Sequence, residues 1–206
     1  MTVNEVVVRS LPIHHLERTS FEEFGSLIAP ETQDSPNLNR APGNMGFLWV
    51  QKALEFPKQA YMCTLRYYHR GTRVEFLQKH PESTITLIPL GGRASVIVVS
   101  PEGSNGRPDI DHARAFLLDG TKGIVMHRGT WLRYAYPLGE FVDFAYITQR
   151  VDPATANSTD DTVRSNLETE FGFVLDLVFR VPEGSGTETG PSGALIAGPR
   201  RNPPNE

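Results

Sequence analysis

Several side chains suited to binding an acidic ligand follow one strand-like segment, GIVMHRGTWLRYAYPL, at residues 123–138. An apolar run leads to His127 and a glycine turn, and four large side chains come after it: Trp131, Arg133, Tyr134 and Tyr136. A guanidinium binds a carboxylate through two hydrogen bonds, and a phenol donates to an oxyanion. An imidazole moves protons near neutral pH. The segment therefore predicts a site for a small carboxylate.

The alternation of side chains along a strand leaves the direction of these groups open. In a regular strand Leu132, Tyr134 and Tyr136 share one face, and Arg133 points the other way. If Leu132 faces a barrel interior, both phenols follow it inward and Arg133 faces outward. A bulge within the segment would instead turn Arg133 inward. A third interpretation is that the tyrosines only fill the core.

The six histidines of the chain differ in their neighbours. His80 and His127 each end a predicted strand, beside Pro81 and near Gly129, and the strand ends of a small barrel are where ligands meet side chains. We take His80 and His127 as catalytic candidates together with Tyr134, although either imidazole could instead be structural. The other four histidines are expected in solvent or beside a turn: His14, His15, His69 and His112.

Most of the chain consists of short segments rich in β-branched and aromatic residues, which is typical of strands. These segments cover residues 5–11, 46–54, 60–69, 72–78, 83–90, 93–100, 122–127, 131–138, 140–150 and 170–180. Helical patterns are confined to 19–25, where Ser20 and Glu23 suit a capping box, to 108–120 and to 160–171. Strands and helices do not alternate. The sequence therefore predicts an all-β fold, an antiparallel barrel or two-sheet jelly roll with two or three short helices.

Two of these segments, 140–150 and 60–69, give further expectations about the direction and burial of their side chains. In the segment 140–150, alternation places Val142, Phe144 and Tyr146 on one face. Cys63 is the single cysteine of the chain, so it forms no intrachain disulfide. Because it lies within the apolar stretch AYMCTLRYY, we expect it to be a small core residue.

The composition indicates an ordinary globular protein of 206 residues, 39% hydrophobic and 21% charged. A net charge of -4 gives no electrostatic reason to expect nucleic acid or an anionic membrane as partner. The pattern of a membrane span or a signal peptide is not found, so the expected location is cytoplasmic. We expect one barrel domain over 1–180, with a polar loop at 29–46, and a Gly/Pro-rich disordered tail over 181–206.

Several segments in order resemble one known family. They are FEEFGSLIAP, LQKHPESTITLIPL, VIVVSP, PDIDHARAFLLDGTKGIVMHRGTW and VDFAYIT, and together they span roughly residues 20–150. In order and spacing they are similar to the ureidoglycolate lyases, cupin-fold enzymes that split ureidoglycolate into glyoxylate and urea. The resemblance implies a cupin-like barrel. It also implies a homodimer, since many members of the family are dimers.

This chain differs from the family pattern where the chemistry would be. Gln78 and Lys79 stand where the family usually has Glu-Arg, and Ile85 stands where it has Gln. Leu132 follows the tryptophan where the family has His-His-Pro, and Thr148 and Gln149 replace an Asp-Arg pair. A metal site needs several converging N or O donors. We therefore expect no bound cofactor; a weakly held divalent metal is the alternative that the residues leave open.

These residues lead to a hypothesis of acid–base chemistry on a small carboxylate-bearing substrate, either an elimination or an isomerisation. The predicted catalytic residues are His80, His127 and Tyr134, and the predicted substrate-binding residues are Arg66, Gln78, Trp131, Arg133 and Tyr136. One alternative is a barrel kept for binding or assembly without catalysis. Another is a true ureidoglycolate lyase. The missing donors disfavour a metal-dependent cupin oxygenase.

Overall fold

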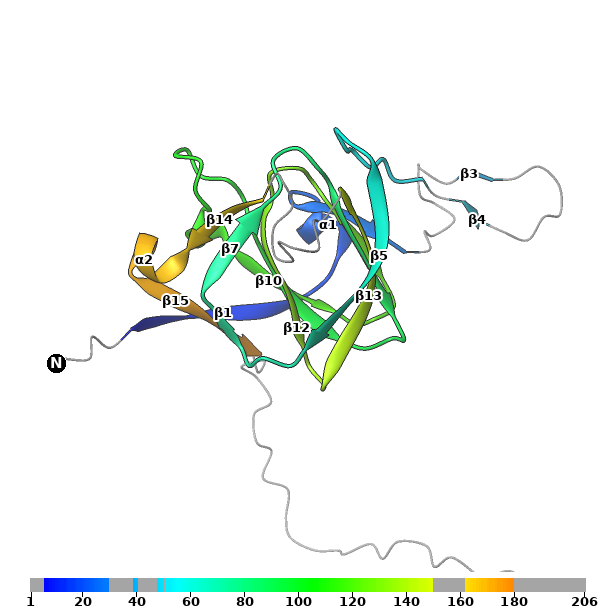
Figure 1. Ribbon diagram of the computed structural model, residues 1–206. Coiled ribbons are helices and arrows are strands. Elements are labelled where there is room, and N and C mark those ends of the chain that lie inside the picture. Colours follow the sequence, from blue (N-terminus) through cyan, green and yellow to red (C-terminus); the bar gives the residue numbers. More distant parts are fainter. Residues whose placement is uncertain (1–5, 30–38, 41–47, 50, 150–161, 180–206) are drawn as a thin grey trace, which may run out of the picture.

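The computed structural model describes residues 6–29, 39–40, 48–49, 51–149 and 162–179 (Figure 1). The predicted tail at 181–206 lies outside the described residues, as does most of the predicted loop at 29–46. No helix within the described ranges is long and apolar enough to cross a membrane.

Two β-sheets curl around a common interior, into which Figure 1 looks. The larger sheet has the strand order β14 (Val163–Asn166), β7 (Phe76–Lys79), β12 (Trp131–Pro137), β9 (Ser95–Ser100), β10 (Arg114–Leu118), β1 (Val7–His15), β15 (Phe173–Phe179) and β6 (Arg73–Val74). The smaller has the order β2 (Gly25–Ile28), β11 (Gly123–Met126), β8 (Ile85–Leu90), β13 (Phe141–Gln149) and β5 (Ala60–Tyr68). A hairpin of β3 (Asn39–Arg40) and β4 (Leu48–Trp49) completes the strands of the described residues.

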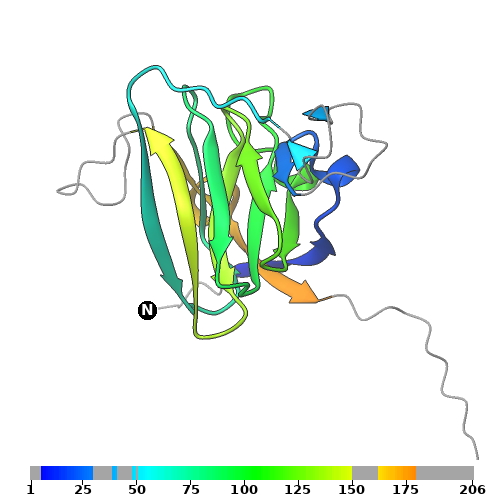
Figure 2. The same cartoon turned by 90° about the vertical axis from the view of Figure 1, so that its right-hand side faces the viewer.

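The predicted all-β class is confirmed, with one difference in strand direction. All pairings within the described sheets are antiparallel except those of β1, which runs parallel to both β10 and β15. The helical elements are short: α1 (Arg18–Phe21), the 3-10 turn Ile110–His112 and α2 (Leu167–Phe171). Figure 2 shows β5 and β13 side by side along one wall of the barrel.

The buried apolar residues form two clusters, one on each face of the larger sheet. Along β9, Ile97 and Val99 belong to the cluster between the two sheets, which we call the interior cluster. Val96 and Val98 belong to the cluster on the opposite face, which includes residues of β15 and α2 and which we call the outer cluster. A strand buried on both faces needs a continuous apolar run, and VIVV at 96–99 is such a run. On β13 the expected alternation is confirmed, with Val142, Phe144 and Tyr146 all in the interior cluster.

The helix predicted over 108–120 is wrong. Only Ile110–His112 forms a single 3-10 turn, with the Asp109 side chain accepting from the His112 backbone N–H, and Arg114–Leu118 is strand β10. The segment RAFLL also fits a strand, because Phe116 and Leu118 alternate with Ala115. Pairing with β9 on one side and with β1 on the other satisfies the backbone of β10 and decides in favour of the strand.

Helices α1 and α2 begin in different ways. In α1 the predicted capping box is wrong, because Ser20 Oγ donates to the carbonyl of Glu17 and no side chain caps the helix. In α2 the side chain of Asn166 accepts from the Thr169 N–H, and Gly172 ends the helix in the left-handed conformation. A helix within 160–171 is thus confirmed, although strand β14 occupies the first part of that segment.

Cys63 is exposed, so its expected burial in the core is wrong. It lies on β5, at the end of the smaller sheet, where residues 60–64 are exposed on both faces. Its thiol donates to the Tyr146 carbonyl at 3.6 Å, and partial burial raises its pKa. An apolar sequence pattern does not reveal that a strand forms a sheet edge, which explains the error.

Gly25 tests the close packing of α1 and β2 against β11. A methyl group on Gly25 would lie 2.2 Å from the Val125 carbonyl oxygen, whereas Gly139 has no heavy atom within 4 Å of the same position. We expect Gly25→Ala to lower the free energy of unfolding by about 1–3 kcal/mol, because the backbone must shift. Urea denaturation measures this change, and Gly139→Ala is the control, expected within about 0.5 kcal/mol of the wild type. Equal stability of the two variants would contradict this packing.

Candidate active site

A hydrogen-bonded group of polar side chains lies inside the barrel. Gln78 Nε2 donates to the Tyr134 hydroxyl at 3.2 Å, and that hydroxyl lies 3.2 Å from the hydroxyl of Tyr146. The three residues come from β7, β12 and β13, so they join the two sheets. Each is buried, and both tyrosines belong to the interior cluster. Of the predicted site residues, Gln78 and Tyr134 are therefore brought together.

Tyr146 and Tyr67 are members of this group that the sequence did not single out. The rings of Tyr67 and Tyr146 both pack against Tyr134, with centroids 5.8 Å and 6.1 Å away. Tyr146 was expected on the same face as Val142 and Phe144, which was a usable signal, whereas Tyr67 lay within a strand with no feature to distinguish it. Burial raises the pKa of Tyr134 and of Tyr67. Both phenols therefore stay neutral and act as hydrogen-bond donors near neutral pH.

His80 is buried directly after β7, two residues beyond Gln78. Its carbonyl accepts from the Gly129 N–H at 2.9 Å, which ties the end of β7 to the turn before β12. Strand alternation gives His80 the same side as Gln78 if the extended course of β7 continues. The predicted catalytic residue His80 is thus buried and lies two residues after Gln78, a member of the Gln78–Tyr134–Tyr146 group.

Strand β12 follows neither of the two arrangements considered from the sequence. Its pairing with β9 shifts register between Arg133 and Tyr136, so a bulge lies after Arg133. Leu132 and Tyr134 belong to the interior cluster, whereas Tyr136 belongs to the outer cluster and donates to the Arg73 carbonyl at 3.1 Å. The expectation that both phenols share one face is therefore wrong: the bulge sends the second one to the opposite side.

Trp131 lies on the outer side of β12, on the face opposite to Tyr134. Trp131 is buried in the outer cluster, with Lys79 Nζ 4.9 Å from the centre of its ring. Arg133 stacks over the ring of Phe76 at 3.8 Å. The structure thus separates Trp131 from the interior phenols, whereas the charge of Arg133 acts on the pKa of Tyr67.

The guanidinium groups of Arg70 and Arg133 are close enough to interact electrostatically, and neither has a carboxylate partner among the described residues. Arg133 Nε is buried and has no hydrogen-bond partner in this part of the chain. Arg70 donates to the Tyr134 carbonyl and lies over the rings of Tyr67 and Tyr136. Burial and then the charge of Arg133 lower the pKa of Arg70, and both cations act to lower the pKa of Tyr67. The positive charge therefore lies near the phenols, and Arg70 is a candidate that the sequence analysis missed.

Arg66 and His127 lie apart from the interior group. Arg66 forms an exposed two-pronged ion pair with Asp143, at 2.6 and 2.8 Å, on the outer face of β5 and β13. This contact lowers the pKa of Asp143. His127 is exposed; its backbone N–H donates to the Phe24 carbonyl, and its Nε2 lies 3.3 Å from the carbonyl of Glu22.

The family model described as ureidoglycolate lyase matches residues 8–170 of the chain. The chain belongs to the ureidoglycolate lyase family. A relative named ureidoglycolate lyase from Azotobacter vinelandii is 27% identical over 127 residues, covering 60% of this chain and 75% of that protein. One of the same name from Pseudomonas fluorescens is 28% identical over 158 residues, covering 75% of this chain and 91% of that protein. A solved structure of RmlC from Streptococcus suis in complex with dTDP-D-xylose has a TM-score of 0.35 and 17% identity, over 64% of this chain and 74% of that chain.

In this member of the ureidoglycolate lyase family, the described side chains inside the barrel are mostly apolar. Ile85 and Leu132, at two positions where the resemblance implied donors, are buried apolar residues of the interior cluster. Gln78 uses its amide nitrogen on Tyr134. Within the described ranges, no three His, Cys, Asp or Glu side chains converge closely enough to hold an ion. The polar groups that the structure brings together there are the Gln78 amide and the hydroxyls of Tyr134 and Tyr146.

The interior hydrogen bonds should couple Tyr134 and Tyr146 energetically. Tyr134→Phe leaves the Gln78 amide without its acceptor, and we expect it to cost about 1–3 kcal/mol of unfolding free energy. With Tyr146→Phe and the double variant, a mutant cycle should give a coupling energy of about 0.5–3 kcal/mol. Denaturant unfolding measures all four proteins. Tyr61→Phe, at an exposed hydroxyl, is the control; additive costs for Tyr134 and Tyr146 would contradict the contact.

The buried phenols should also make stability fall at alkaline pH. An unfolded tyrosine loses its proton near pH 10, whereas burial keeps Tyr134 and Tyr67 protonated above that pH in the folded protein. The folded state then binds more protons than the unfolded state. Raising the pH above 10 should therefore lower the unfolding free energy by up to about 1.4 kcal/mol per pH unit for each such phenol.

Chemical denaturation between about pH 9 and pH 11 measures this slope. Tyr134→Phe should make it shallower, because one raised pKa is removed. The same slope in the variant and in the wild type would show that Tyr134 does not hold its proton in the folded state.

Proposed function

We propose that the chain is a lyase that acts on a small carboxylate-bearing substrate by acid–base elimination, or an isomerase that acts on such a substrate, without a tightly bound metal. Family membership supports the general class of reaction. The observation that supports the chemistry is the buried Gln78–Tyr134–Tyr146 group inside the barrel, with buried His80 beside it in the chain.

His80 is assigned the proton transfer. If the substrate is ureidoglycolate, the imidazole takes the proton of the substrate hydroxyl as the carbon–nitrogen bond breaks. The hydroxyl carbon becomes the aldehyde of glyoxylate, and the departing nitrogen receives a proton to give urea. Atoms and charge balance without an oxidant or a metal, and one base that returns its proton is sufficient.

Tyr134 is assigned the stabilisation of negative charge on the substrate oxygen. A phenol can do this only while it keeps its proton, and burial raises the pKa of Tyr134. Gln78 donates to the same hydroxyl oxygen, so the proton of Tyr134 is directed away from Gln78. The amide is therefore proposed to orient the donor.

The carboxylate of the substrate is proposed to bind Arg70 and Arg133. Both act electrostatically on Tyr67, and neither has an acidic partner among the described residues. A guanidinium that already holds a carboxylate is a poor receptor for another. Arg66 forms such an ion pair with Asp143, so it is not assigned a role in binding the substrate carboxylate.

A non-catalytic binding or assembly protein is the second candidate. One observation favours it: Tyr134 and Tyr146 are packed in the interior cluster with apolar neighbours, as core residues are. In that case the barrel has kept its fold while the phenols only fill space. Formation of a product distinguishes the two candidates, since both could bind a ligand.

The first experiment measures release of urea and glyoxylate from racemic ureidoglycolate by the purified chain, with and without a chelator. Turnover that resists the chelator supports metal-free lyase chemistry on this substrate. Turnover abolished by the chelator would overturn the metal-free part. No turnover excludes ureidoglycolate as substrate, and a screen of other hydroxy acids then decides between another lyase and the binding protein.

On a substrate that is turned over, His80→Gln should lower kcat by about 10²-fold or more, since general acid–base catalysis contributes that much. Tyr134→Phe should lower it by a similar factor through loss of one oxyanion donor. His112→Gln is the matched control, because His112 is an exposed histidine paired with Asp109. Circular dichroism confirms folding, and unchanged kcat in a folded His80→Gln protein would refute the assignment.

A further inference from the structure

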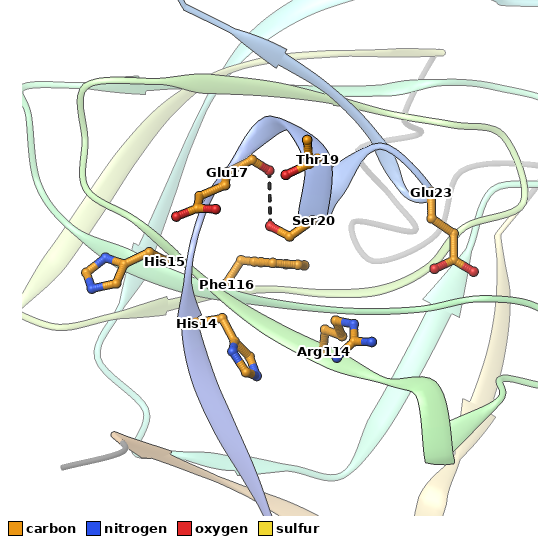
Figure 3. Close-up of a pocket in the computed structure, with 8 residues that line it drawn as sticks. All are labelled: His14, His15, Glu17, Thr19, Ser20, Glu23, Arg114 and Phe116. Atoms are coloured by element: carbon orange, nitrogen blue, oxygen red, sulfur yellow. Dashed lines mark hydrogen bonds between the residues drawn. The ribbon is translucent and has the colours of Figure 1, made fainter. Parts of the chain in front are cut away.

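A hollow of about 440 Å³ lies between the segment that contains α1 and the neighbouring strands β1 and β10 (Figure 3). His14, Arg114 and Phe116 line it from the two strands. Glu17, Ser20 and Glu23 line it from the segment that contains α1. His14 was expected in solvent. The hollow that it lines could not be predicted locally, because His14 and Arg114 are about a hundred residues apart in the chain.

The hollow reaches the inner side of the larger sheet. Phe116 belongs to the interior cluster, and Arg114 lies two residues before it on the same face of β10. Arg114 is paired with Val99 of β9, which is paired in turn with Leu132 of β12. Leu132 is paired with Gln78, so Arg114 and Gln78 lie in one row across four strands. The hollow is therefore separated from Gln78 by the width of strands β9 and β12.

The charges around the hollow are sorted by sign. The positive charge of Arg114 lies on the strand side, and the carboxylates of Glu17 and Glu23 belong to the α1 side, with Phe116 between them in Figure 3. Within the described residues, the side chains of Arg114, Glu17 and Glu23 form no ion pair with one another or with any other group. Opposite charges that face a common space without meeting leave both signs available to a ligand.

We propose that this hollow binds a small zwitterion of the α-amino acid class. Its carboxylate would face Arg114, its ammonium would face Glu17 and Glu23, and its side chain would lie against Phe116. A simple anion would be repelled by the two carboxylates, and a simple cation by Arg114. The described residues include no group of three metal-ligating side chains, so a metal ion does not fit. The volume is in the range of small-molecule sites.

A ligand in the hollow would also act on the end of the barrel that contains His127. The Phe24 carbonyl, just after α1, accepts from the His127 N–H at 2.9 Å and from Thr130 Oγ1 at 3.2 Å. A zwitterion that bridges α1 and β10 would hold this contact in place. The binding itself is independent of the proposed catalysis and is measured without turnover.

The test is an NMR titration of the full chain with the standard L-α-amino acids, supported by calorimetry. At least one should bind and shift the resonances of the α1 segment. Its N-acetyl derivative, which lacks the ammonium, and its amide, which lacks the carboxylate, should each bind tenfold or more weakly, since hydrogen bonds to charged groups contribute this much. No binding by any amino acid, or equal binding of either derivative, would overturn the proposal.

Matched variants locate the site. Arg114→Gln and Glu23→Gln should each weaken binding tenfold or more. Arg93→Gln, an exposed arginine over Phe141, and Glu22→Gln, an exposed neighbour of Glu23, should leave the affinity unchanged. Because the lining charges are exposed, all four variants should fold, and circular dichroism verifies this. Affinity unchanged by Arg114→Gln would place the ligand elsewhere and refute the proposal.

Discussion

The burial of β12 on both faces is the constraint on which the arrangement of this protein depends. One face of the strand supplies the interior cluster with Leu132 and Tyr134, and the other supplies the outer cluster with Trp131 and Tyr136. No side chain of such a strand can simply point to water. A slip of one residue would exchange the contents of the two clusters. The bulge after Arg133 therefore determines which chemical groups face the barrel interior and which do not.

The distribution of charge follows from this constraint. An ion buried without a partner is far more costly than a buried neutral group that is hydrogen-bonded. The interior accordingly contains an amide and phenols that satisfy one another, whereas Arg133 stacks on Phe76 and Arg70 reaches in only as far as the Tyr134 carbonyl. The resulting site has neutral donors inside and cations at its border. That division suits a substrate whose carboxylate stays near the surface while its reacting oxygen enters the barrel.

Local sequence patterns predicted features that depend on a single strand, such as the alternation of its side chains. They failed for features that depend on the pairing of strands distant in the sequence. The alternation of β13 and the all-β class were visible because burial of one face imposes a period of two. The segment 108–120 was ambiguous, since its apolar residues fit both a helix and a strand, and only pairing with β9 and β1 resolves it. The directions of Arg133 and Tyr136 depend on the register with β9, which no local pattern contains. The hollow at Arg114 needs α1 and β10 together, so neither segment alone could indicate it.

Gln78, Ile85 and Leu132, the three buried positions at which the chain differs from the pattern that the family resemblance implied, depend on one another energetically. A carboxylate at position 78 would be buried beside two phenols, and it would need a metal or a cation to offset its desolvation. Leu132 and Ile85 supply neither, because both are apolar members of the interior cluster. An amide at this position keeps a donor for Tyr134 without introducing a charge. Gln78, Ile85 and Leu132 thus form one consistent neutral environment, and restoring a single charged residue of the family pattern would leave that charge uncompensated.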